Sequence, residues 1–236
     1  MQNNNQIQDQ YGNSYNHLLP LVVGGLTITC EDNMDLMSRY PDNYFDLAIV
    51  DPPYGIGNKL VDGGGTRKAK FDNDRNSIKW DNKPNYKYFE ELKRVSKNQI
   101  VWGGNYLIRP MIIADFEIES SCWLIWDKIQ EFTGSDFEMA WTSFDKASKA
   151  FRMSRVEAYS KGKIHPTQKP TKLYKWLLKN YAKEGDKILD THLGSGSIAI
   201  ACHDYKFELT ACELDPEYFE KAKQRIINHV AQQSLF

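Results

Sequence analysis

A carboxylate, two prolines and a tyrosine stand together at the end of a short apolar run. The run Leu47–Val50 predicts a buried strand, and Asp51-Pro52-Pro53-Tyr54 follows it directly. A proline cannot donate to a strand ladder, so the strand must end here, with Asp51 held extended at its carboxyl end. Open α/β sheets bind ligands at that end of their strands. The Asp51 carboxylate, the Pro52 carbonyl and the Tyr54 ring therefore predict a site for a flat molecule that carries an amino group.

A second group of residues with chemical potential follows another predicted strand, late in the chain. It comprises an acid and a glycine turn, Asp190 and Gly194-Ser195-Gly196. Glycines in such a turn let the backbone approach a ligand closely. The next strand ends at Glu213, and an acid there can accept hydrogen bonds from both hydroxyls of a ribose. The turn also fits the dinucleotide fingerprint Gly-x-Gly-x-x-Ala, so a nicotinamide-dependent oxidoreductase stays open at this point.

A third motif, His165-Pro166-Thr167-Gln168-Lys169-Pro170, precedes a predicted helix. Two prolines fix this loop, and Thr167 or Thr171 can cap the helix. The free N–H groups at a helix start can bind an anion. The motif is therefore a candidate for holding a negatively charged group.

Together, these motifs resemble those of the S-adenosylmethionine-dependent DNA amino-methyltransferases. Asp51-Pro52-Pro53-Tyr54 is similar to the catalytic motif of that family, and aspartate at its first position is more typical of adenine-N6 enzymes than of cytosine-N4 enzymes. The resemblance covers about residues 26–225. It includes three shorter fragments in the family's order, which are Trp102-Gly103-Gly104-Asn105-Tyr106, Trp126-Asp127-Lys128 and Phe137-Glu138.

The resemblance implies roles for individual residues. Asp51 and the Pro52 carbonyl would accept the two hydrogens of the target amino group, and Tyr54 would stack on the target base, so the implied catalytic set is Asp51, Pro52, Pro53 and Tyr54. Asp32, which is also a plain helix cap, matches a position near the adenine ring of the cofactor, and Lys169 would face its methionine carboxylate. The implied cofactor-binding residues are Asp32, Asp51, His165, Thr167, Lys169, Asp190, His192, Gly194, Ser195, Gly196 and Glu213.

One of these residues departs from the family's pattern. His192 stands where the family usually carries a phenylalanine that packs near the methionine. The departure bears on cofactor affinity, while the glycines and Asp190 are kept.

The expected function is site-specific methylation of a flipped-out adenine at N6, with S-adenosylmethionine as cofactor and double-stranded DNA as partner. Base flipping follows because the amino group is stacked and paired in a duplex. The chain has no Pro-Cys dipeptide, which argues against methylation at cytosine carbon 5, and no metal ligand set is visible. The alternatives are cytosine-N4 or RNA methylation, an oxidoreductase, and a non-catalytic DNA-binding relative. A homodimer and a restriction endonuclease partner stay open.

The elements that must position these residues alternate between strands and helices early in the chain and are mostly strands later. Strands are predicted over 21–30, 47–50, 99–102, 121–126, 138–144, 187–189 and 209–212. Helices are predicted over 34–39, 86–96, 197–203 and 216–232, and another starts at Pro170. This order predicts an α/β fold with a mostly parallel sheet and one antiparallel strand. The resemblance implies a seven-stranded, Rossmann-like methyltransferase sheet. Its motif order is circularly permuted because the catalytic strand precedes the cofactor strand.

Composition bounds the class of protein. The chain has 236 residues, 41% of them hydrophobic and 26% charged, which predicts one domain over 17–236 after a flexible tail over 1–16. The net charge of −1 gives no global attraction to nucleic acid, so DNA contact needs a local basic face. No apolar run reaches the length of a membrane span. The four cysteines form no Cys-x-x-Cys pair, which favours reduced, buried thiols in a cytoplasmic protein. The resemblance to DNA amino-methyltransferases implies that this protein is bacterial or phage-encoded.

Two segments are candidates for contact with the target. Residues 55–85 form a long loop, rich in glycine and basic residues, directly after the catalytic motif, and we expect it to fold over the target or to be a disordered insertion. Residues 145–163 are basic with interleaved aromatic residues. They are either a short target-recognition segment or a solvated face.

Overall fold

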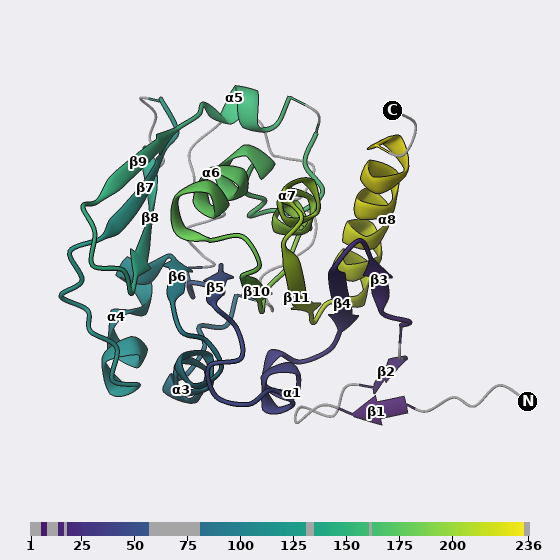
Figure 1. Ribbon diagram of the computed structural model, residues 1–236, viewed down its shortest axis with the longest axis horizontal. Helices are drawn as coiled ribbons and strands as arrows, with labels where there is room; N and C mark the ends of the chain where they lie inside the picture. The colour runs from purple at the N-terminus through teal and green to yellow at the C-terminus, as the bar shows by residue number, and fades with distance from the viewer. Residues whose placement is uncertain are drawn as a thin grey trace, which may run out of the picture.

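The computed structural model describes residues 6–8, 14–16, 18–56, 81–130, 135–160 and 162–233. The strands of its large sheet are β3 (Leu21–Val23), β4 (Leu26–Cys30), β5 (Leu47–Val50), β6 (Gln99–Trp102), β7 (Trp123–Asp127), β8 (Phe137–Thr142), β9 (Lys149–Arg152), β10 (Lys187–Asp190) and β11 (Glu208–Glu213). They lie in the order β3-β4-β11-β10-β5-β6-β8-β7-β9 (Figure 1).

Seven of these strands form the predicted sheet, in the order β4-β11-β10-β5-β6-β8-β7. All are parallel except β8, which pairs antiparallel with both β6 and β7. The fold class and the single antiparallel strand are therefore confirmed. Two short edge strands extend this sheet: β3 pairs antiparallel with β4, and β9 pairs parallel with β7.

The prediction of one strand over residues 21–30 was wrong, because the chain makes a hairpin there. Gly24 and Gly25 have φ angles of 53° and 81°, a left-handed backbone that favours glycine and reverses the chain. Val22 and Thr27 then face each other across the pair β3–β4. The apolar run was continuous, so the two glycines were the only signal of the turn.

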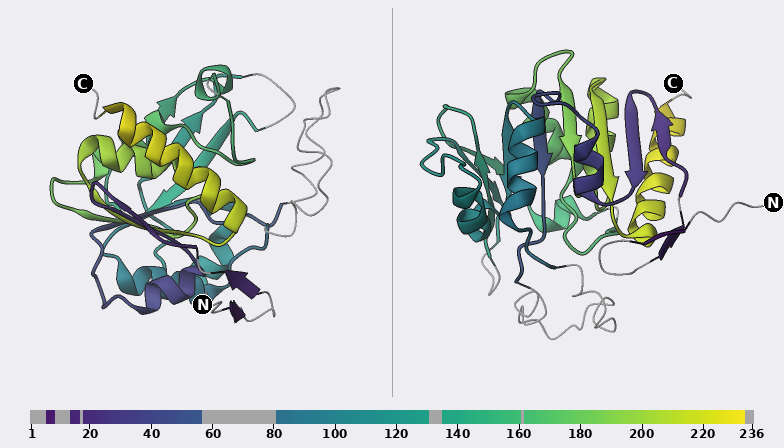
Figure 2. Two further views of the ribbon diagram at one scale, coloured as in Figure 1. Left: turned by 90° about the vertical axis from the view of Figure 1, so that its right-hand side faces the viewer. Right: turned by 90° about the horizontal axis from the view of Figure 1, so that it is seen from below.

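Helices cover both faces of the sheet, as the edge-on view in Figure 2 makes clear. One face carries α1 (Asn33–Ser38), α3 (Tyr86–Val95) and α4 (Gly104–Ile113), and the other carries α6 (Thr171–Tyr181), α7 (Ser197–Tyr205) and α8 (Pro216–Gln233). A further short helix, α5 (Arg155–Ala158), follows β9.

The sequence of β5 explains its central position. Successive side chains of a strand point to opposite faces. Leu47 and Ile49 join the hydrophobic cluster under α6, α7 and α8, while Ala48 and Val50 join the cluster under α1, α3 and α4. Because all four side chains are apolar, β5 is buried on both faces and Asp51 emerges from the middle of the sheet.

The remaining predicted elements form close to their expected bounds. The last helix packs through Phe219, Ala222 and Ile226, which are fully buried and lie three or four residues apart on one face of the helix. All four cysteines are free, and Cys30 alone among them is only partly buried. No described helix has the length and apolarity needed to cross a membrane.

Two predicted segments fall largely outside the described residues. Within the tail over 1–16, β1 (Gln6–Gln8) and β2 (Ser14–Asn16) form a separate antiparallel pair. Within the loop over 55–85, residues 57–80 lie outside the described part of the chain.

Candidate active site

The predicted site residues gather at one edge of the sheet. Strands β4, β11, β10 and β5 are consecutive and parallel, so their carboxyl ends meet at the same edge. These ends carry Asp32, Glu213, Asp190 and Asp51. The catalytic motif and the glycine turn, distant in sequence, therefore follow neighbouring strands.

Both oxygens of the Asp51 carboxylate have partners. The Tyr54 hydroxyl donates to Oδ1 at 2.5 Å, and the Lys169 ammonium contacts Oδ2. Tyr54 thus folds back onto the acid three residues before it, and the two prolines between them hold the short arm. The Gly55 N–H, after the arm, donates to Asp81 Oδ1 at 2.9 Å, which closes the turn.

The Tyr54 ring lies against the first glycine of the Trp102-Gly103-Gly104-Asn105-Tyr106 fragment. A Cβ on Gly103 would stand 2.0 Å from the ring carbon Cε1 of Tyr54. Gly103 also has a φ of 67°, so glycine is required there for two reasons. The Tyr106 ring stacks on Tyr54 with centroids 5.4 Å apart, and Tyr106 is the more exposed ring of the pair.

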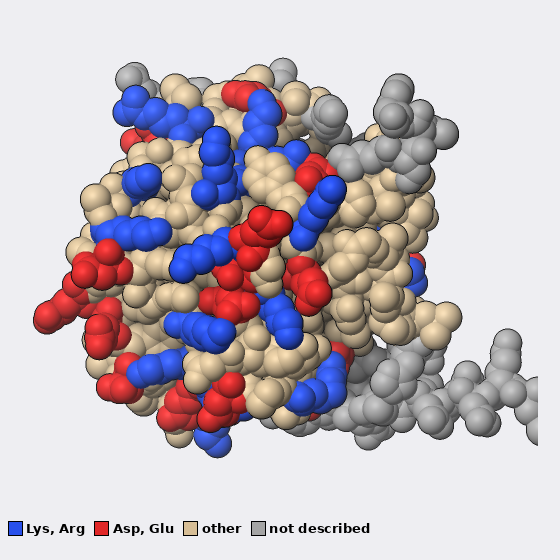
Figure 3. All heavy atoms as spheres, viewed as in Figure 1, with Lys and Arg blue, Asp and Glu red and all other residues tan. Residues whose placement is uncertain are grey.

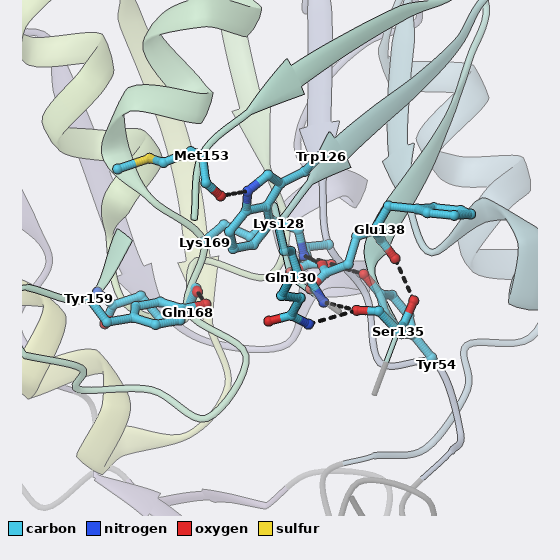
Figure 4. Close-up of polar contacts among 12 residues, drawn as sticks. Tyr54, Trp126, Lys128, Gln130, Ser135, Glu138, Met153, Tyr159, Gln168 and Lys169 are labelled. Atoms are coloured by element: carbon cyan, nitrogen blue, oxygen red, sulfur yellow. Dashed lines mark hydrogen bonds and ion pairs between the residues drawn. The ribbon is translucent and has the colours of Figure 1, made fainter. Parts of the chain in front are cut away.

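Lys169 is the most buried cation of the site, with a side chain only 1% exposed. Its Nζ contacts Asp51, lies 3.2 Å from Glu138 Oε2 and donates to the Tyr54 hydroxyl at 3.3 Å. Lys128 pairs with the other oxygen of Glu138 at 3.0 Å. Figure 4 shows the side chains of Lys128, Glu138 and Lys169 converging on this cluster. The predicted role of Lys169 toward the methionine carboxylate stays a prediction, since its contacts in this structure are to the two acids.

The charges of this cluster depend on one another. Burial acts to raise the pKa of Glu138, but Lys169 and Lys128 outweigh it and hold that pKa at about 2. Burial acts to lower the pKa of Lys169, and the carboxylates of Asp51 and Glu138 raise it above its usual value. Burial raises the pKa of Asp51, and Lys169 limits that rise. The cluster thus contains two carboxylates and two ammonium groups, and their opposite charges cancel.

The glycine turn takes the backbone shape that its sequence predicts. Gly194 and Gly196 have φ angles of 53° and 72°. Glu213 accepts the Gly194 N–H at 2.7 Å and the Asp215 N–H at 3.0 Å, so this acid ties the turn to the end of β11. Asp190 accepts the His192 N–H at 3.0 Å. Burial raises the pKa of Asp190 to about 8.

His192 is half-buried and neutral. Burial lowers its pKa to about 3. Asn33 Nδ2 lies 3.3 Å from Nε2 and can only donate, so Nδ1 carries the ring proton and donates to Thr191 Oγ1 at 2.9 Å. The Tyr88 ring meets the imidazole edge-on at 5.4 Å. The histidine therefore links the end of β10 to the start of α1.

The His165 motif lies over the glycine turn. A Cβ on Gly194 would stand 3.5 Å from the His165 ring, and the Tyr218 ring contacts the imidazole with centroids 4.3 Å apart. Nδ1 of His165 accepts from the Thr167 N–H at 3.3 Å, so the ring is neutral. Burial, Lys163 and Lys169 lower its pKa to about 3. In the same motif, the Gln168 carbonyl accepts the Tyr159 hydroxyl at 2.8 Å (Figure 4).

The structure adds residues that sequence reasoning missed. Arg225 of α8 donates to the Ser195 carbonyl at 2.7 Å and to Thr171 Oγ1 at 3.4 Å, which joins the glycine turn to the start of α6. Arg225 lies three residues after Ala222, which is on the buried face of α8. This spacing is the feature of the sequence that could have placed Arg225 near the site. Glu138 and Lys128 belong to fragments that carried the resemblance, but no role had been assigned to them.

The basic segment over 145–163 packs along the edge of the sheet. Its β9 pairs with β7, and Arg152 pairs with Asp127 at 3.1 Å. Lys163 stands over the Tyr159 ring at 4.8 Å, and burial lowers its pKa to about 8. On the face seen in Figure 3, Lys and Arg side chains gather in the upper part, where β9 and α5 lie in Figure 1.

Among the described residues, one group has the spacing of metal ligands, and it lies away from this site. It consists of His203, Asp204 and His229, on α7 and α8. His229 pairs with Asp204 at 2.6 Å, and the Lys175 ammonium pairs with the other Asp204 oxygen at 2.6 Å. This carboxylate is already neutralised, so the group acts as a hydrogen-bonded ion-pair network.

Comparisons with known proteins identify relatives of this chain. A family profile described as DNA methylase matches residues 119–224, which include Glu138, the His165 motif and the glycine turn. The Type II methyltransferase M.HpaI of Haemophilus parainfluenzae is 25% identical over 84% of this chain and 73% of its own. The Type II methyltransferase M2.MboI of Moraxella bovis is 26% identical over 81% of this chain and 84% of its own.

Solved structures share the fold. The crystal structure of an M1.HpyAVI–SAM complex aligns with a TM-score of 0.57 at 16% identity, over 85% of this chain and 98% of its own. The cytosine-N4-specific PvuII DNA methyltransferase aligns with a TM-score of 0.57 at 14% identity, over 88% of this chain and 92% of its own. TTHA0409 of Thermus thermophilus, complexed with S-adenosyl-L-methionine, aligns with a TM-score of 0.55 at 15% identity, over 86% of this chain and 95% of its own.

Proposed function

Since the chain belongs to the S-adenosylmethionine-dependent DNA amino-methyltransferases, we propose that it methylates adenine at N6 in double-stranded DNA. The observation that carries this proposal is the position of Asp51 and the glycine turn at the carboxyl ends of the neighbouring strands β5 and β10. An acceptor held at Asp51 and a cofactor held at the glycine turn would share one edge of the sheet.

The cofactor site is proposed on the chemistry of its donors and acceptors. Gly194 and Gly196 give the turn its left-handed backbone, and a side chain at either position would meet the His165 ring or Ile226. Asp32 and Glu213 follow the paired strands β4 and β11, where acceptors can bind the hydroxyl and amino groups of an adenosine. The other residues proposed to line the site are His165, Thr167, Asp190, His192 and Ser195.

Bound S-adenosylmethionine supplies an electrophilic methyl group, and the protein supplies position. The amino nitrogen of adenine shares its lone pair with the ring and is a weak nucleophile. Asp51 and the Pro52 carbonyl accept its two hydrogens and turn the lone pair toward the methyl carbon. The new nitrogen–carbon bond would form as the sulfur–carbon bond breaks, and the nitrogen would pass its surplus proton to the Asp51 carboxylate and from there to solvent. Such a direct displacement depends mainly on orientation.

The choice of adenine over cytosine rests on Asp51. The fold does not separate the two, because the cytosine-N4-specific PvuII enzyme aligns as well as the other structures. Mass spectrometry of nucleosides from methylated DNA distinguishes N6-methyladenine from N4-methylcytosine. N4-methylcytosine as the product would refute the adenine assignment and leave the DNA amino-methyltransferase assignment intact.

The target base must leave the duplex to reach Asp51, and aromatic rings are proposed to receive it. Tyr54 already stacks on Tyr106, and Tyr106 is the more exposed of the two. Base–aromatic stacking contributes about 1–3 kcal/mol per base. The segments 55–85 and 145–163 are proposed to contact the flanking DNA.

The relatives named as Type II methyltransferases support a place in restriction and modification. A restriction endonuclease partner and a homodimer are part of this proposal. Size-exclusion chromatography with light scattering, with and without duplex DNA, tests the homodimer.

Two rival classes make different predictions. An oxidoreductase would bind a nicotinamide dinucleotide at the glycine turn and leave the Asp51 motif without a role. Calorimetry with S-adenosylhomocysteine and with the dinucleotide separates the two. A non-catalytic relative would bind DNA without transferring a labelled methyl group, and the intact Asp51-Pro52-Pro53-Tyr54 motif argues against it.

A further inference from the structure

Lys169 is buried between two acids that come from different parts of the chain. Asp51 follows β5, Glu138 belongs to β8, and the Lys169 ammonium contacts both. Lysine is almost never buried to this degree unless it is paired. One carboxylate would satisfy that need. The second carboxylate, Glu138, places another charged partner within reach of the same ammonium.

We propose that Lys169 is a positioning residue for methyl transfer, which releases Asp51 to the target amino group by moving its ammonium toward Glu138. This inference rests on the proposed function. It gives the third motif a role at the acceptor, whereas the resemblance implied a role at the cofactor carboxylate.

Both carboxylate oxygens of Asp51 are already hydrogen-bonded or paired within the protein. Oδ1 receives the Tyr54 hydroxyl at 2.5 Å and Oδ2 receives the Lys169 ammonium. A target amino group must donate to this same carboxylate. It can take the place of the ammonium on Oδ2 only if the ammonium has somewhere else to go.

Glu138 provides that second position. Its Oε2 is already 3.2 Å from the Lys169 Nζ, so the ammonium keeps a charged partner as it leaves Asp51. Lys128 holds the other oxygen of Glu138 at 3.0 Å and keeps the carboxylate in place. The Trp102 ring lies 5.2 Å from the Lys169 Nζ, and this cation–π contact also stabilises the ammonium.

The Lys169 ammonium also balances the negative charges of Asp51 and Glu138. Without the ammonium, Asp51 would face Glu138 with no cation between them. Two neighbouring carboxylates raise each other's pKa, so Asp51 would take up a proton near neutral pH and lose its acceptor oxygen. Lys169 therefore also keeps Asp51 ionised while the site is empty of substrate.

Other titratable groups around Asp51 are mostly neutral near neutral pH. They are Tyr54, Tyr88 of α3, Tyr159 after α5, Tyr174 of α6 and Asp190 of β10. Burial raises the pKa of each tyrosine, so these hydroxyls stay protonated. Asp190 also has a raised pKa, of about 8, and adds little negative charge below that pH. Lys169 and Glu138 therefore dominate the charge that Asp51 experiences.

The test compares Lys169→Met with Lys172→Met as a matched control. Lys172 is an exposed lysine that pairs with Glu157 at 2.8 Å. For Lys169→Met, we expect kcat to fall about 100-fold and the acid limb of its pH profile to move up by about one pH unit. The Kd for S-adenosylhomocysteine should stay within about threefold of the wild type. Lys172→Met should match the wild type throughout.

A lysine that held the cofactor carboxylate would behave differently. Lys169→Met would then weaken S-adenosylhomocysteine binding about tenfold or more, with kcat at saturating cofactor and its pH profile unchanged. That result would overturn the proposal.

A second variant guards against misfolding. Lys169→Met combined with Glu138→Gln removes one charge of each sign, so the cluster stays neutral overall. We expect this double variant to melt at a higher temperature than Lys169→Met and to remain as slow in methyl transfer. Full recovery of kcat in the double variant would contradict the need for the ammonium.

Thermal stability provides a readout that does not depend on activity. In Lys169→Met, the uncompensated acids have raised pKa values in the folded state, so stability is highest at low pH and is lost as pH rises through those values. The melting temperature of this variant should therefore fall further below the wild type at pH 8 than at pH 5. If the difference in melting temperature between Lys169→Met and the wild type did not change with pH, Lys169 would not be the group that balances the charge of these acids. Wild-type protein that transfers no methyl group to DNA would refute the proposed function and leave this stability result to be judged separately.

Discussion

The Glu213 carboxylate accepts the backbone N–H of Gly194 at 2.7 Å, across the ends of the neighbouring strands β11 and β10. One acid thus shapes the glycine turn and, in the proposed function, also binds the ribose hydroxyls of the cofactor. Burial raises its pKa, and the N–H groups of Asp215 and Gly194 limit that rise.

Replacement of this acid should weaken cofactor binding more than folding. Glu213→Gln keeps the size of the side chain but removes the charge that accepts these hydrogen bonds. Hydrogen bonds to charged groups contribute about 1.5–3 kcal/mol, so we expect the Kd for S-adenosylhomocysteine to rise at least about tenfold in calorimetry. Glu208→Gln, at the exposed start of the same strand, is the control and should bind as the wild type does. Equal affinity of both variants would remove Glu213 from the cofactor site.

Arg225 of α8 should stabilise the conformation of the glycine turn. Its guanidinium contacts the Ser195 carbonyl, Ser197 Oγ and Thr171 Oγ1. Arg225→Met leaves these groups without their donor, and we expect the free energy of unfolding to fall by about 1–3 kcal/mol. Chemical denaturation measures this change. Lys223→Met, whose lysine contacts Glu220 and the Leu19 carbonyl on the surface, should change it by less than about 1 kcal/mol.

Gly103→Ala should displace Tyr54. The added Cβ would stand 2.0 Å from the Tyr54 ring, so the ring must move and its hydrogen bond to Asp51 must break. We expect a lower melting temperature and a loss of methyl transfer with cofactor binding retained. Gly185→Ala is the control, because Gly185 has a comparable φ of 84° but nothing within 4 Å of an added Cβ. Similar losses in both variants would mean that backbone strain alone explains the effect.

His192 should make the fold sensitive to acid. Its folded-state pKa of about 3 lies below the usual value of 6.5. A histidine with a lowered pKa contributes full stability above about pH 6.5 and loses it as pH falls toward 3, because only the unfolded chain binds the proton. Between about pH 6.5 and pH 3, the free energy of unfolding should therefore decrease less steeply in His192→Phe than in the wild type. The difference in slope should be up to about 1.4 kcal/mol per pH unit. An unchanged slope in this variant would show that His192 is protonated in the folded protein.

Much of this site could be predicted from single stretches of sequence. Asp51 was placed correctly at a strand end because the apolar run before it and the prolines after it act locally. The glycine turn was placed for the same reason, since only glycine adopts the φ angles of Gly194 and Gly196 at no cost.

The rest depends on contacts between distant parts of the chain. Glu138 and Lys169 come together only because β8 pairs with β6 beside β5, and no local pattern encodes that pairing. The strand β9 was missed because its sequence, Lys-Ala-Phe-Arg, is short and basic and is supported by its neighbour β7. The hairpin at Gly24 was missed because apolar residues continue on both sides of it.

The central claim is that Asp51 holds an adenine amino group for methyl transfer from a cofactor bound at the adjacent strand. The most direct measurement is transfer of a labelled methyl group from S-adenosylmethionine to duplex DNA by wild type and Asp51→Ala, together with the Kd of each for S-adenosylhomocysteine. We expect wild type to produce N6-methyladenine. Asp51→Ala should produce none while it binds S-adenosylhomocysteine within about threefold of the wild type. Methyl transfer by Asp51→Ala at a rate near that of the wild type would contradict the account.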